Sequence, residues 1–343
     1  MIFNKYIKSI FLFFFLFKKI NWIKFLKLYS NNADNIIYLS FLAGRFSNEI
    51  FIWDLANINN VIESDLKFKV SIKLDHFKNK KIWWSPSAHL APKTIKNYAL
   101  HLFNFAERIE SKGNKLFPSS YETSLYENKS HMHKLFDDFG IRTPKTTILN
   151  SVEELDSKNL KYPILLKGEY SSGSKDIYKF SNAHDLKDFL HNSNYLNKFN
   201  KIIIQELLNI RRDLRVTLVG EEIVLFYWRI NNDSNWKPTA SSFGASIFFD
   251  DFPKKWEKYI VDNFNKLNLK MGAFDVAWDN DNLSNEPYFL EVSPRFSPNP
   301  PLFSDNNTNY GKWKKKLIGK KIYYKEQANL IFSISKKYFK IAL

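Results

Sequence analysis

One segment near the end of the chain, residues 271–295, constrains the fold more than any other. It reads MGAFDVAWDNDNLSNEPYFLEVSPR, which is two apolar strands joined by a polar turn rich in Asn and Asp. Asp275 lies within the first apolar run and Glu291 within the second. Pairing the two strands as an antiparallel hairpin can place these carboxylates side by side on one face.

Two neighbouring carboxylates repel each other unless positive charge lies between them. A divalent cation is the simplest source of that charge, and ligands that are all oxygen favour Mg²⁺ or Mn²⁺. Because Mg²⁺ with few protein ligands usually also binds substrate phosphates, the segment predicts a nucleotide-phosphate site.

The composition limits the class of protein. A chain of 343 residues can bury a large core divided among two or three subdomains. It contains no cysteine, which excludes thiol catalysis, zinc–thiolate sites and disulfides. That composition suits a reducing compartment, and we therefore expect a cytoplasmic protein.

The positive charge is concentrated at the two ends of the chain. Residues 1–29 contain six lysines and no acidic residue, and residues 310–343 contain ten lysines and one glutamate, out of a net charge of +16. The intervening body is nearly neutral. This distribution argues against nucleic acid as a partner of the body.

The N-terminal end combines lysines with large apolar residues. The run IFLFFFLF is too short to span a bilayer, and because Lys18 and Lys19 follow it without a cleavage site, we do not expect secretion. The next residues, INWIKFLKLY, suit a helix in a membrane interface, which would attach the protein peripherally to the inner membrane face. They equally suit a helix docked on the body with solvated lysines. Residues 327–343 have the same character more weakly, and there a docked helix is favoured.

Strands and helices alternate over residues 30–125, which predicts an α/β domain. We expect strands at residues 35–41, 81–86 and 115–118, and a helix over residues 93–112 that ends at Gly113. No phosphate-binding glycine fingerprint occurs there, and residues 43–80 show no pattern that can be assigned.

Residues 126–300 predict a second mixed region. The expected elements are helices at 128–139, 185–190 and 254–267 and strands at 145–149, 163–168 and 177–180, with three more strands within 201–230. Residues 231–246 are polar and rich in Ser and Asn, and they predict a loop.

Two lysines in this region occupy positions that suit phosphate. Lys167 ends a buried strand and precedes GEYSSGSK, a flexible loop whose backbone N–H groups could close over a phosphate. The alternative is an exposed hairpin turn. Lys129 lies at the start of a helix, where anions are favoured, and its alternative is an ordinary solvated lysine.

Two further clusters are ambiguous when taken alone. Gln205 and Glu206 end a strand whose edge could hold an adenine ring, or they belong to a core strand. The cluster of Arg211, Arg212, Asp213 and Arg215 can bind phosphate or carboxylate, or can form surface ion pairs. The seven histidines show no metal-ligand spacing.

The order of these pieces resembles the ATP-grasp superfamily over about residues 120–300, and within it the ribosomal-protein glutamate ligases and related carboxylate–amine ligases. The segments that carry the resemblance are QELLNIRRDLRVTLVG, FYWR and EVSPR. The resemblance implies an ATP-grasp fold preceded by a small Rossmann-like α/β domain. The domain bounds that we expect are 1–29 (basic helix), 30–125, 126–300 (ATP-grasp) and 301–343 (basic segment).

The resemblance also implies a role for each matching residue. Lys129 and Lys167 would contact ATP phosphates beneath a loop at Ser171–Lys175, and Asp213 would touch the ribose. The remaining nucleotide-binding residues would be Ser172, Gly173 and Ser174 in the loop and Gln205, Glu206, Leu207 and Leu208 at the adenine. The catalytic arginines would be Arg215, Arg229 and Arg295, and the metal ligands Asp275, Glu291 and Ser293. Ser293 departs from the family pattern, which has Asn there, and a hydroxyl is a shorter and weaker ligand.

The implied activity is an ATP- and Mg²⁺-dependent ligase that joins a small-molecule carboxylate to an amine through an acyl phosphate. Such a reaction requires no covalent enzyme intermediate, which agrees with the absence of cysteine. The alternative is an ATP-binding, membrane-associated scaffold or regulator without ligase turnover, which the serine at position 293 and the basic ends would suit.

Overall fold

The computed structural model describes residues 15–39, 48–86, 97–171, 173–233, 235–302 and 317–343. Ser172, the start of the apolar run at residues 10–14 and the first residues of the helix expected from Lys93 lie outside these ranges. The chain divides into two compact units. The first comprises residues 1–93, 101–123 and 295–343, and the second comprises residues 94–100 and 124–294.

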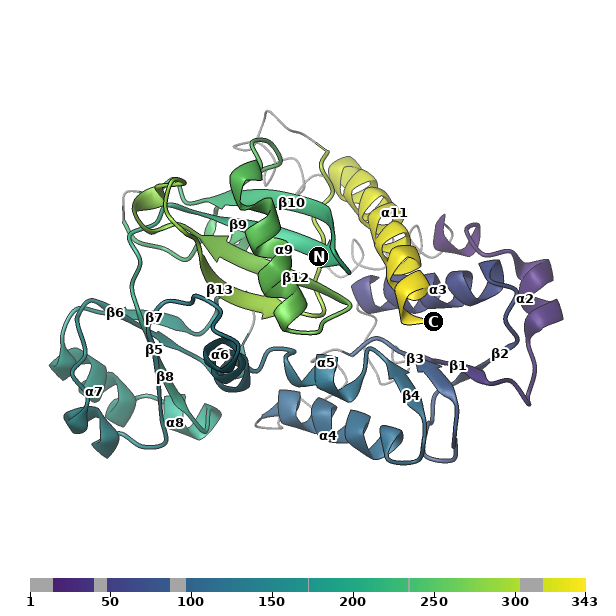
Figure 1. Ribbon diagram of the computed structural model, residues 1–343, viewed down its shortest axis with the longest axis horizontal. Helices are drawn as coiled ribbons and strands as arrows, with labels where there is room; N and C mark the ends of the chain where they lie inside the picture. Colours follow the sequence, from purple (N-terminus) through teal and green to yellow (C-terminus); the bar gives the residue numbers. More distant parts are fainter. Residues whose placement is uncertain (1–14, 40–47, 87–96, 172, 234, 303–316) are drawn as a thin grey trace. The chain divides into compact units, whose positions relative to one another are not determined.

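The first unit is an α/β layer structure around a parallel sheet. The strand order is β2-β1-β3-β4, and every neighbouring pair is parallel. The elements, coloured purple, blue and yellow in Figure 1, are α2 (Trp22–Leu28), β1 (Asn35–Tyr38), α3 (Asn48–Glu63), β2 (Phe68–Ser71), β3 (Lys81–Trp83), α4 (Tyr98–Glu110), β4 (Lys115–Phe117), α5 (Ser120–Ser124) and α11 (Leu317–Ala342). The α/β class expected for this region is confirmed.

Alternation along the strands assigns the helices to opposite faces of this sheet. Ile82 and Leu116 pack with Ala106 and Ile109 of α4. Trp83, which points to the other face, stacks with its ring centroid 4.2 Å from that of Phe339 in α11. The sheet therefore forms the middle of three layers.

The C-terminal helix α11 is anchored on α3. The side-chain amide of Asn60 donates a hydrogen bond of 2.8 Å to Ser335 Oγ, and Lys336 Nζ lies 2.8 Å from the carboxylate of Glu63. The docked helix favoured for residues 327–343 is thus present. None of the helices in the described ranges is long and apolar enough to cross a membrane.

The second unit contains two antiparallel sheets with helices packed on them (Figure 1). The four-stranded sheet has the order β5-β8-β6-β7 and the five-stranded sheet has the order β11-β10-β9-β12-β13. The first part comprises α6 (Lys129–Asp138), β5 (Thr146–Leu149), η3 (Glu153–Ser157), β6 (Ile164–Lys167), β7 (Ile177–Phe180), α7 (Ala183–Asn192), α8 (Tyr195–Lys198) and β8 (Ile202–Glu206). The second comprises β9 (Arg212–Val219), β10 (Glu222–Ile230), η4 (Ser241–Phe243), β11 (Ser246–Phe248), η5 (Lys254–Trp256), α9 (Glu257–Lys266), β12 (Met271–Ala277), η6 (Asp279–Asp281) and β13 (Tyr288–Ser293).

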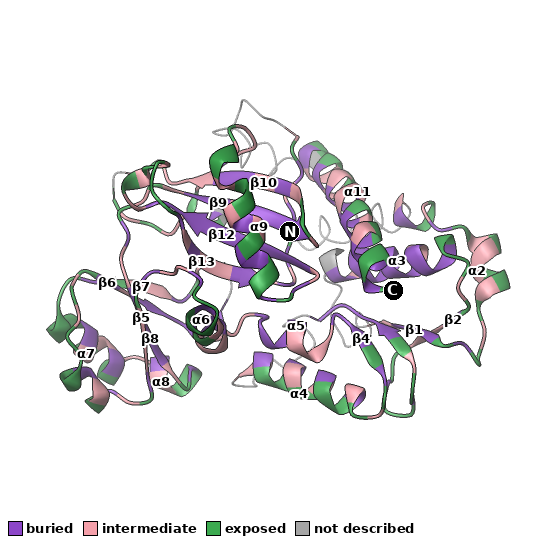
Figure 2. Ribbon diagram, in the orientation of Figure 1, coloured by how far each residue is buried: buried purple, intermediate pink, exposed green. Residues whose placement is uncertain are grey.

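Strand β12 lies between β9 and β13 and is buried along its whole length, as the purple ribbon in Figure 2 shows. On one of its faces, Phe274 packs against Phe264 of α9 and Phe289 of β13, with centroid distances of 5.7 and 4.5 Å. The neighbouring residue Asp275 consequently points to the opposite face. The apolar packing of β12 thus fixes the direction of its carboxylate.

Candidate active site

The expected hairpin is present, and its register places the two acids opposite each other. β12 pairs with β13 in antiparallel fashion with Asp275 opposite Glu291, and on its other side β12 pairs with β9 with Asp275 opposite Arg215. Side chains at opposed positions of antiparallel strands share a face of the sheet. Glu291, Asp275 and Arg215 therefore form one row of charged side chains across three strands.

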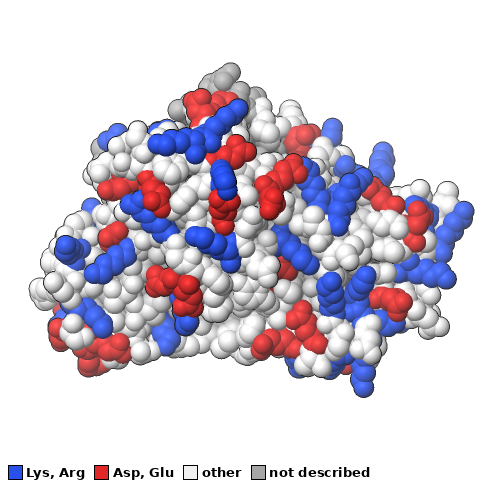
Figure 3. Space-filling view, in the orientation of Figure 1, with Lys and Arg blue, Asp and Glu red and all other residues white. Residues whose placement is uncertain are grey.

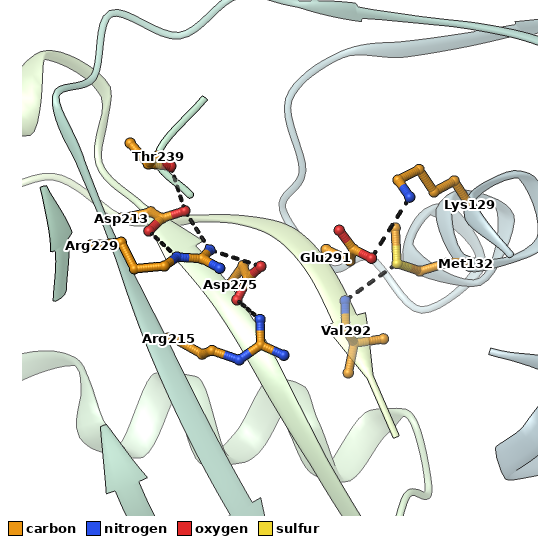
Figure 4. Close-up of polar contacts among 9 residues, drawn as sticks. All are labelled: Lys129, Met132, Asp213, Arg215, Arg229, Thr239, Asp275, Glu291 and Val292. Atoms are coloured by element: carbon orange, nitrogen blue, oxygen red, sulfur yellow. Dashed lines mark hydrogen bonds and ion pairs between the residues drawn. The ribbon is translucent and has the colours of Figure 1, made fainter. Parts of the chain in front are cut away.

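Both oxygens of Asp275 are bound by arginines. Arg215 donates to Asp275 Oδ1 over 2.8 Å, and Arg229 Nη2 lies 2.8 Å from Asp275 Oδ2 (Figure 4). Burial alone would raise the pKa of Asp275, but the two guanidinium groups outweigh it and lower the pKa below its ordinary value. Asp275 is therefore ionised in a nearly solvent-free setting.

Arg229 bridges two carboxylates from neighbouring strands. Its Nε and Nη2 donate to the two oxygens of Asp213 over 2.7 and 2.6 Å, a bidentate pairing, while Nη2 also faces Asp275 (Figure 4). The Thr239 hydroxyl donates to Asp213 over 2.7 Å. Asp213, assigned to the ribose by the family resemblance, thus holds an arginine in place. Nothing in the sequence of the polar loop marked Thr239 as part of this network.

The two lysines expected at the phosphates come from different elements and are both buried. Lys129 is the first residue of α6, and its Nζ lies 3.8 Å from Glu291 Oε1 and donates to the Ser171 carbonyl over 2.5 Å. Lys167 ends β6. The pKa of Lys167 is lowered to about 8, mainly by burial; the positive charge of Lys129 acts in the same direction and the negative charge of Glu291 opposes it. Both lysines therefore interact with Glu291, at one end of the charged row.

The helix that carries Lys129 is attached to the loop after Lys167. The Lys129 N–H donates to the Glu169 carbonyl over 3.1 Å, and Ser130 Oγ donates to the Glu169 carboxylate over 2.6 Å. Met132, on the same helix, accepts a contact of 3.3 Å from the Val292 N–H of β13 (Figure 4). Glu169 is buried. Its position between a glycine and a tyrosine in the sequence did not indicate that it would attach α6 to this loop.

The loop between β6 and β7 has the turn geometry that its Ser/Gly composition predicts. Gly173 and Ser174 have φ values of +65° and +58°, in the region that glycine adopts at least cost. Ser242 Oγ of the 231–246 loop donates to the Gly173 carbonyl over 3.2 Å, so the two loops meet. Ser172, expected to bind phosphate here, lies outside the described residues.

The side chain of Gln205 is buried and contacts two polar side chains of the second unit. Its side-chain amide donates to Thr146 Oγ1 over 2.9 Å and lies 3.4 Å from His133 Nε2. Burial, with the positive charges of Lys167 and Lys129, lowers the pKa of His133 to about 3 and keeps its ring neutral. His131 contacts Ser124 instead, at 3.1 Å, so the two histidines have separate partners.

The other residues expected at the adenine follow directly after β8. The Glu206 N–H is bound to the Lys145 carbonyl over 2.9 Å, and β8 ends there. Leu207 is half-buried and Leu208 is buried. Arg295 belongs to the first unit, where its guanidinium lies 4.0 Å from the ring centroid of Trp53.

The donor atoms near Glu291 determine what metal they could hold. Within the ranges that the structure describes, no group of three or more His, Cys, Asp or Glu residues could enclose an ion. Glu291 is more open than Asp275, with 28% of its side chain exposed, and Ser293 lies two residues further on the same face. Such a set fits Mg²⁺ bound by one or two carboxylates together with phosphates, and it does not fit a cage made of protein ligands alone. Because Arg215, Arg229 and Lys129 already compensate the two acids, their repulsion does not by itself require a metal.

The chain is similar in sequence to known ligases, although no family model matches it. It is 28% identical over 138 residues to a coenzyme gamma-F420-2:alpha-L-glutamate ligase of Methanococcus maripaludis, which covers 37% of this chain and 46% of that enzyme. The enzyme of the same name from Methanocaldococcus jannaschii is 25% identical over 224 residues, 62% of this chain and 73% of that one. The alpha-aminoadipate–LysW ligase LysX of Saccharolobus solfataricus is 31% identical over 160 residues, 45% of this chain and 55% of that one. The matched segments thus span from about half to about three quarters of these relatives.

Solved structures show the fold independently. A D-alanine–D-alanine ligase from Bacillus anthracis complexed with ATP matches with a TM-score of 0.52 at 13% identity, over 91% of this chain and 99% of that one. A RimK domain ATP-grasp protein from Sphaerobacter thermophilus matches with a TM-score of 0.51 at 12% identity, over 88% and 98%. From the charged hairpin, the two lysines and these similarities together, the chain has the ATP-grasp fold and is similar in sequence to carboxylate–amine ligases.

Proposed function

We propose that this protein is an ATP- and Mg²⁺-dependent ligase that joins a carboxylate to an amine through an acyl phosphate. The observation that carries the proposal is the row of Glu291, Asp275 and Arg215, with Arg229 beside it and Lys129 at its open end. This row offers positive charge for phosphate and carboxylate groups and, at Glu291, an oxygen ligand for a cation. The relatives named above are ligases, which supports turnover over a scaffold that only binds ATP.

Lys129, Lys167 and the Ser171–Lys175 loop would hold the nucleotide phosphates. Both lysines are buried, so a phosphate beside them would interact with little screening by water. The segment Glu206–Leu208 would face the adenine, because β8 has ended there and apolar side chains follow. Glu291, with Asp275 and Ser293, would hold Mg²⁺, which supplies charge neutralisation for the phosphates when bound.

Arg215 and Arg229 would bind the acyl substrate. In the first step a carboxylate oxygen of the substrate attacks the γ-phosphorus, the bond from that phosphorus to the bridging oxygen breaks, and ADP leaves. In the second step the amine attacks the acyl carbon, phosphate leaves and the amine loses a proton. The fixed guanidinium groups would stabilise the negative charge on the acyl oxygen without reorganising. Asp213 would position Arg229. Arg295 is a third candidate for an arginine that binds the acyl substrate.

The test is Glu291→Gln in purified full-length protein. The variant is expected to lose at least about tenfold in ADP formation, because the neutral amide is a weaker ligand for Mg²⁺ than a carboxylate. ADP release would be measured with coupled detection over a series of Mg²⁺ concentrations, and ATP binding by calorimetry. The acceptors should include glutamate and α-aminoadipate, the amino acids named in the relatives, with a panel of carboxylates as acyl donors.

The matched control is Glu257→Gln on the exposed face of α9, which should leave both measurements unchanged. Unchanged Mg²⁺ dependence in Glu291→Gln would show that the metal assignment is wrong. ATP binding without ADP release for every donor and acceptor pair would instead favour the scaffold alternative. Peripheral membrane association, also expected from the sequence, concerns a different surface of the chain.

A further inference from the structure

The short helix α2 is docked on the first unit through aromatic contacts on one side. The ring of Phe25 meets that of Phe68 edge-on with centroids 5.0 Å apart, and Trp22 stacks on Phe17 at 4.3 Å. Lys24 forms an ion pair of 2.9 Å with Asp65. The helix therefore has a fixed orientation on the body.

The other side of α2 presents large apolar residues to solvent. Ile23 is 71% exposed and Leu26 is 75% exposed, and no residue of the helix is buried, which Figure 2 shows as pink and green ribbon. Residues three apart lie on the same face of a helix, so these two side chains form one outward patch. Phe17 and Tyr29 at the two ends of the segment are also partly exposed.

The segment that carries this patch is itself basic. Lys18 and Lys27 are exposed, and the first 29 residues contain no acidic residue. Blue side chains, with some red ones among them, lie at the right-hand edge of the face drawn in Figure 3, where Figure 1 places α2. Adjacent lysines and outward aliphatic side chains are what an anionic lipid surface recognises, because the lysines approach the headgroups while the apolar residues enter the interface.

We propose that α2 is a membrane-contact element, with Ile23 and Leu26 inserted into an anionic lipid surface and Lys18 and Lys27 against its headgroups. A nucleic acid would use the lysines but not the aliphatic patch. A second copy of this chain would bring a second set of lysines to the same patch, which like-charge repulsion disfavours. Since the patch is small, the contact is reversible and depends on charge as well as on burial.

The experiment is co-sedimentation of the full-length protein with vesicles of mixed phosphatidylglycerol and phosphatidylcholine, compared with phosphatidylcholine alone. Binding is expected only to the anionic vesicles, and it should fall as salt shortens the screening length from about 10 Å at 0.1 M to about 3 Å at 1 M. Ile23→Ser combined with Leu26→Ser should weaken binding at least about tenfold, because the apolar area that enters the interface is lost. Ile23→Trp with Leu26→Trp should strengthen it, an outcome that misfolding cannot produce.

Lys18→Glu with Lys27→Glu should also weaken vesicle binding, whereas Lys254→Glu on an exposed turn of the second unit is the matched control and should not. Equal vesicle binding by the wild-type protein and the serine variant would overturn the proposal. The proposal would also be overturned if the wild-type protein bound no vesicles and the serine variant changed only the oligomeric mass in light scattering, which would favour a second copy of this chain. Loss of oligonucleotide binding in the glutamate variant, with no vesicle binding in the wild type, would overturn it in favour of nucleic acid.

Discussion

Arg229 shows how one side chain can organise a site. It contacts the carboxylates of Asp213 and Asp275, which come from different strands, and a lysine in its place could not reproduce the bidentate geometry. Two arginines contact Asp275, whereas the metal ion expected between Asp275 and Glu291 stays a prediction. The sequence showed the charged cluster at residues 211–215 but not the partner of each member, because those partners depend on the register of β9 against β10 and β12.

Lys167 leads to a prediction about pH. Its pKa of about 8 lies below the ordinary value of 10.5, so between these values the unfolded chain binds the extra proton and the free energy of unfolding rises with pH. The affinity for ATP should depend on pH in the opposite direction, because the phosphates favour the charged form of the lysine. We expect ATP affinity to fall by up to about tenfold per pH unit above pH 8, because binding then takes up a proton.

Calorimetric titration of ATP across this pH range checks the expectation, with Lys167→Arg as the comparison. Arginine remains charged throughout, so the affinity of that variant should change much less with pH. An identical pH profile in the two proteins would assign the titration to another group.

At the scale of elements, the segments with local signals were predictable. The hairpin of β12 and β13 follows from two apolar runs and a polar turn, and it formed with Asp275 opposite Glu291 as expected. Helix α3 was not predictable within the unassigned residues 43–80. It buries polar residues, and Asn60 finds its partner Ser335 on a helix 275 residues later. Local periodicity carries no information about such a pair.

The turn after β6 provides the test at this scale. A Cβ atom at Gly168 would lie 2.5 Å from the ring of Phe199 and 2.7 Å from Asp176 Cβ, so Gly168→Ala requires the neighbours to move. We expect a loss of about 1–3 kcal/mol in the free energy of unfolding, the usual cost of overpacking. Urea denaturation measures it.

Phe199→Leu should relieve part of this clash, so the double variant should lose less than the sum of the two single losses. Gly173→Ala is the matched control, because a Cβ atom added there would have no neighbour within 4 Å and only the positive φ is strained. Additive losses in Gly168→Ala and Phe199→Leu would show that the clash is not the cause.

For the whole molecule, the closure of the first unit by α11 makes the end of the chain part of its core. Phe339 is buried against Trp83, whereas Ile341 nearby is 46% exposed. Phe339→Ala should therefore cost about 3–5 kcal/mol of stability and Ile341→Ala much less. Thermal denaturation of both variants compares them, and equal losses would mean that α11 does not depend on this contact.

The position of α11 also bears on how the chain is made. The parallel sheet of the first unit is complete by residue 117, yet the helix that covers one of its faces begins at residue 317. During synthesis the ribosome delivers residues 124–294, which are most of the second unit, between these two events. The second unit can therefore fold while the first still exposes Trp83, and the first becomes complete only when the last helix emerges.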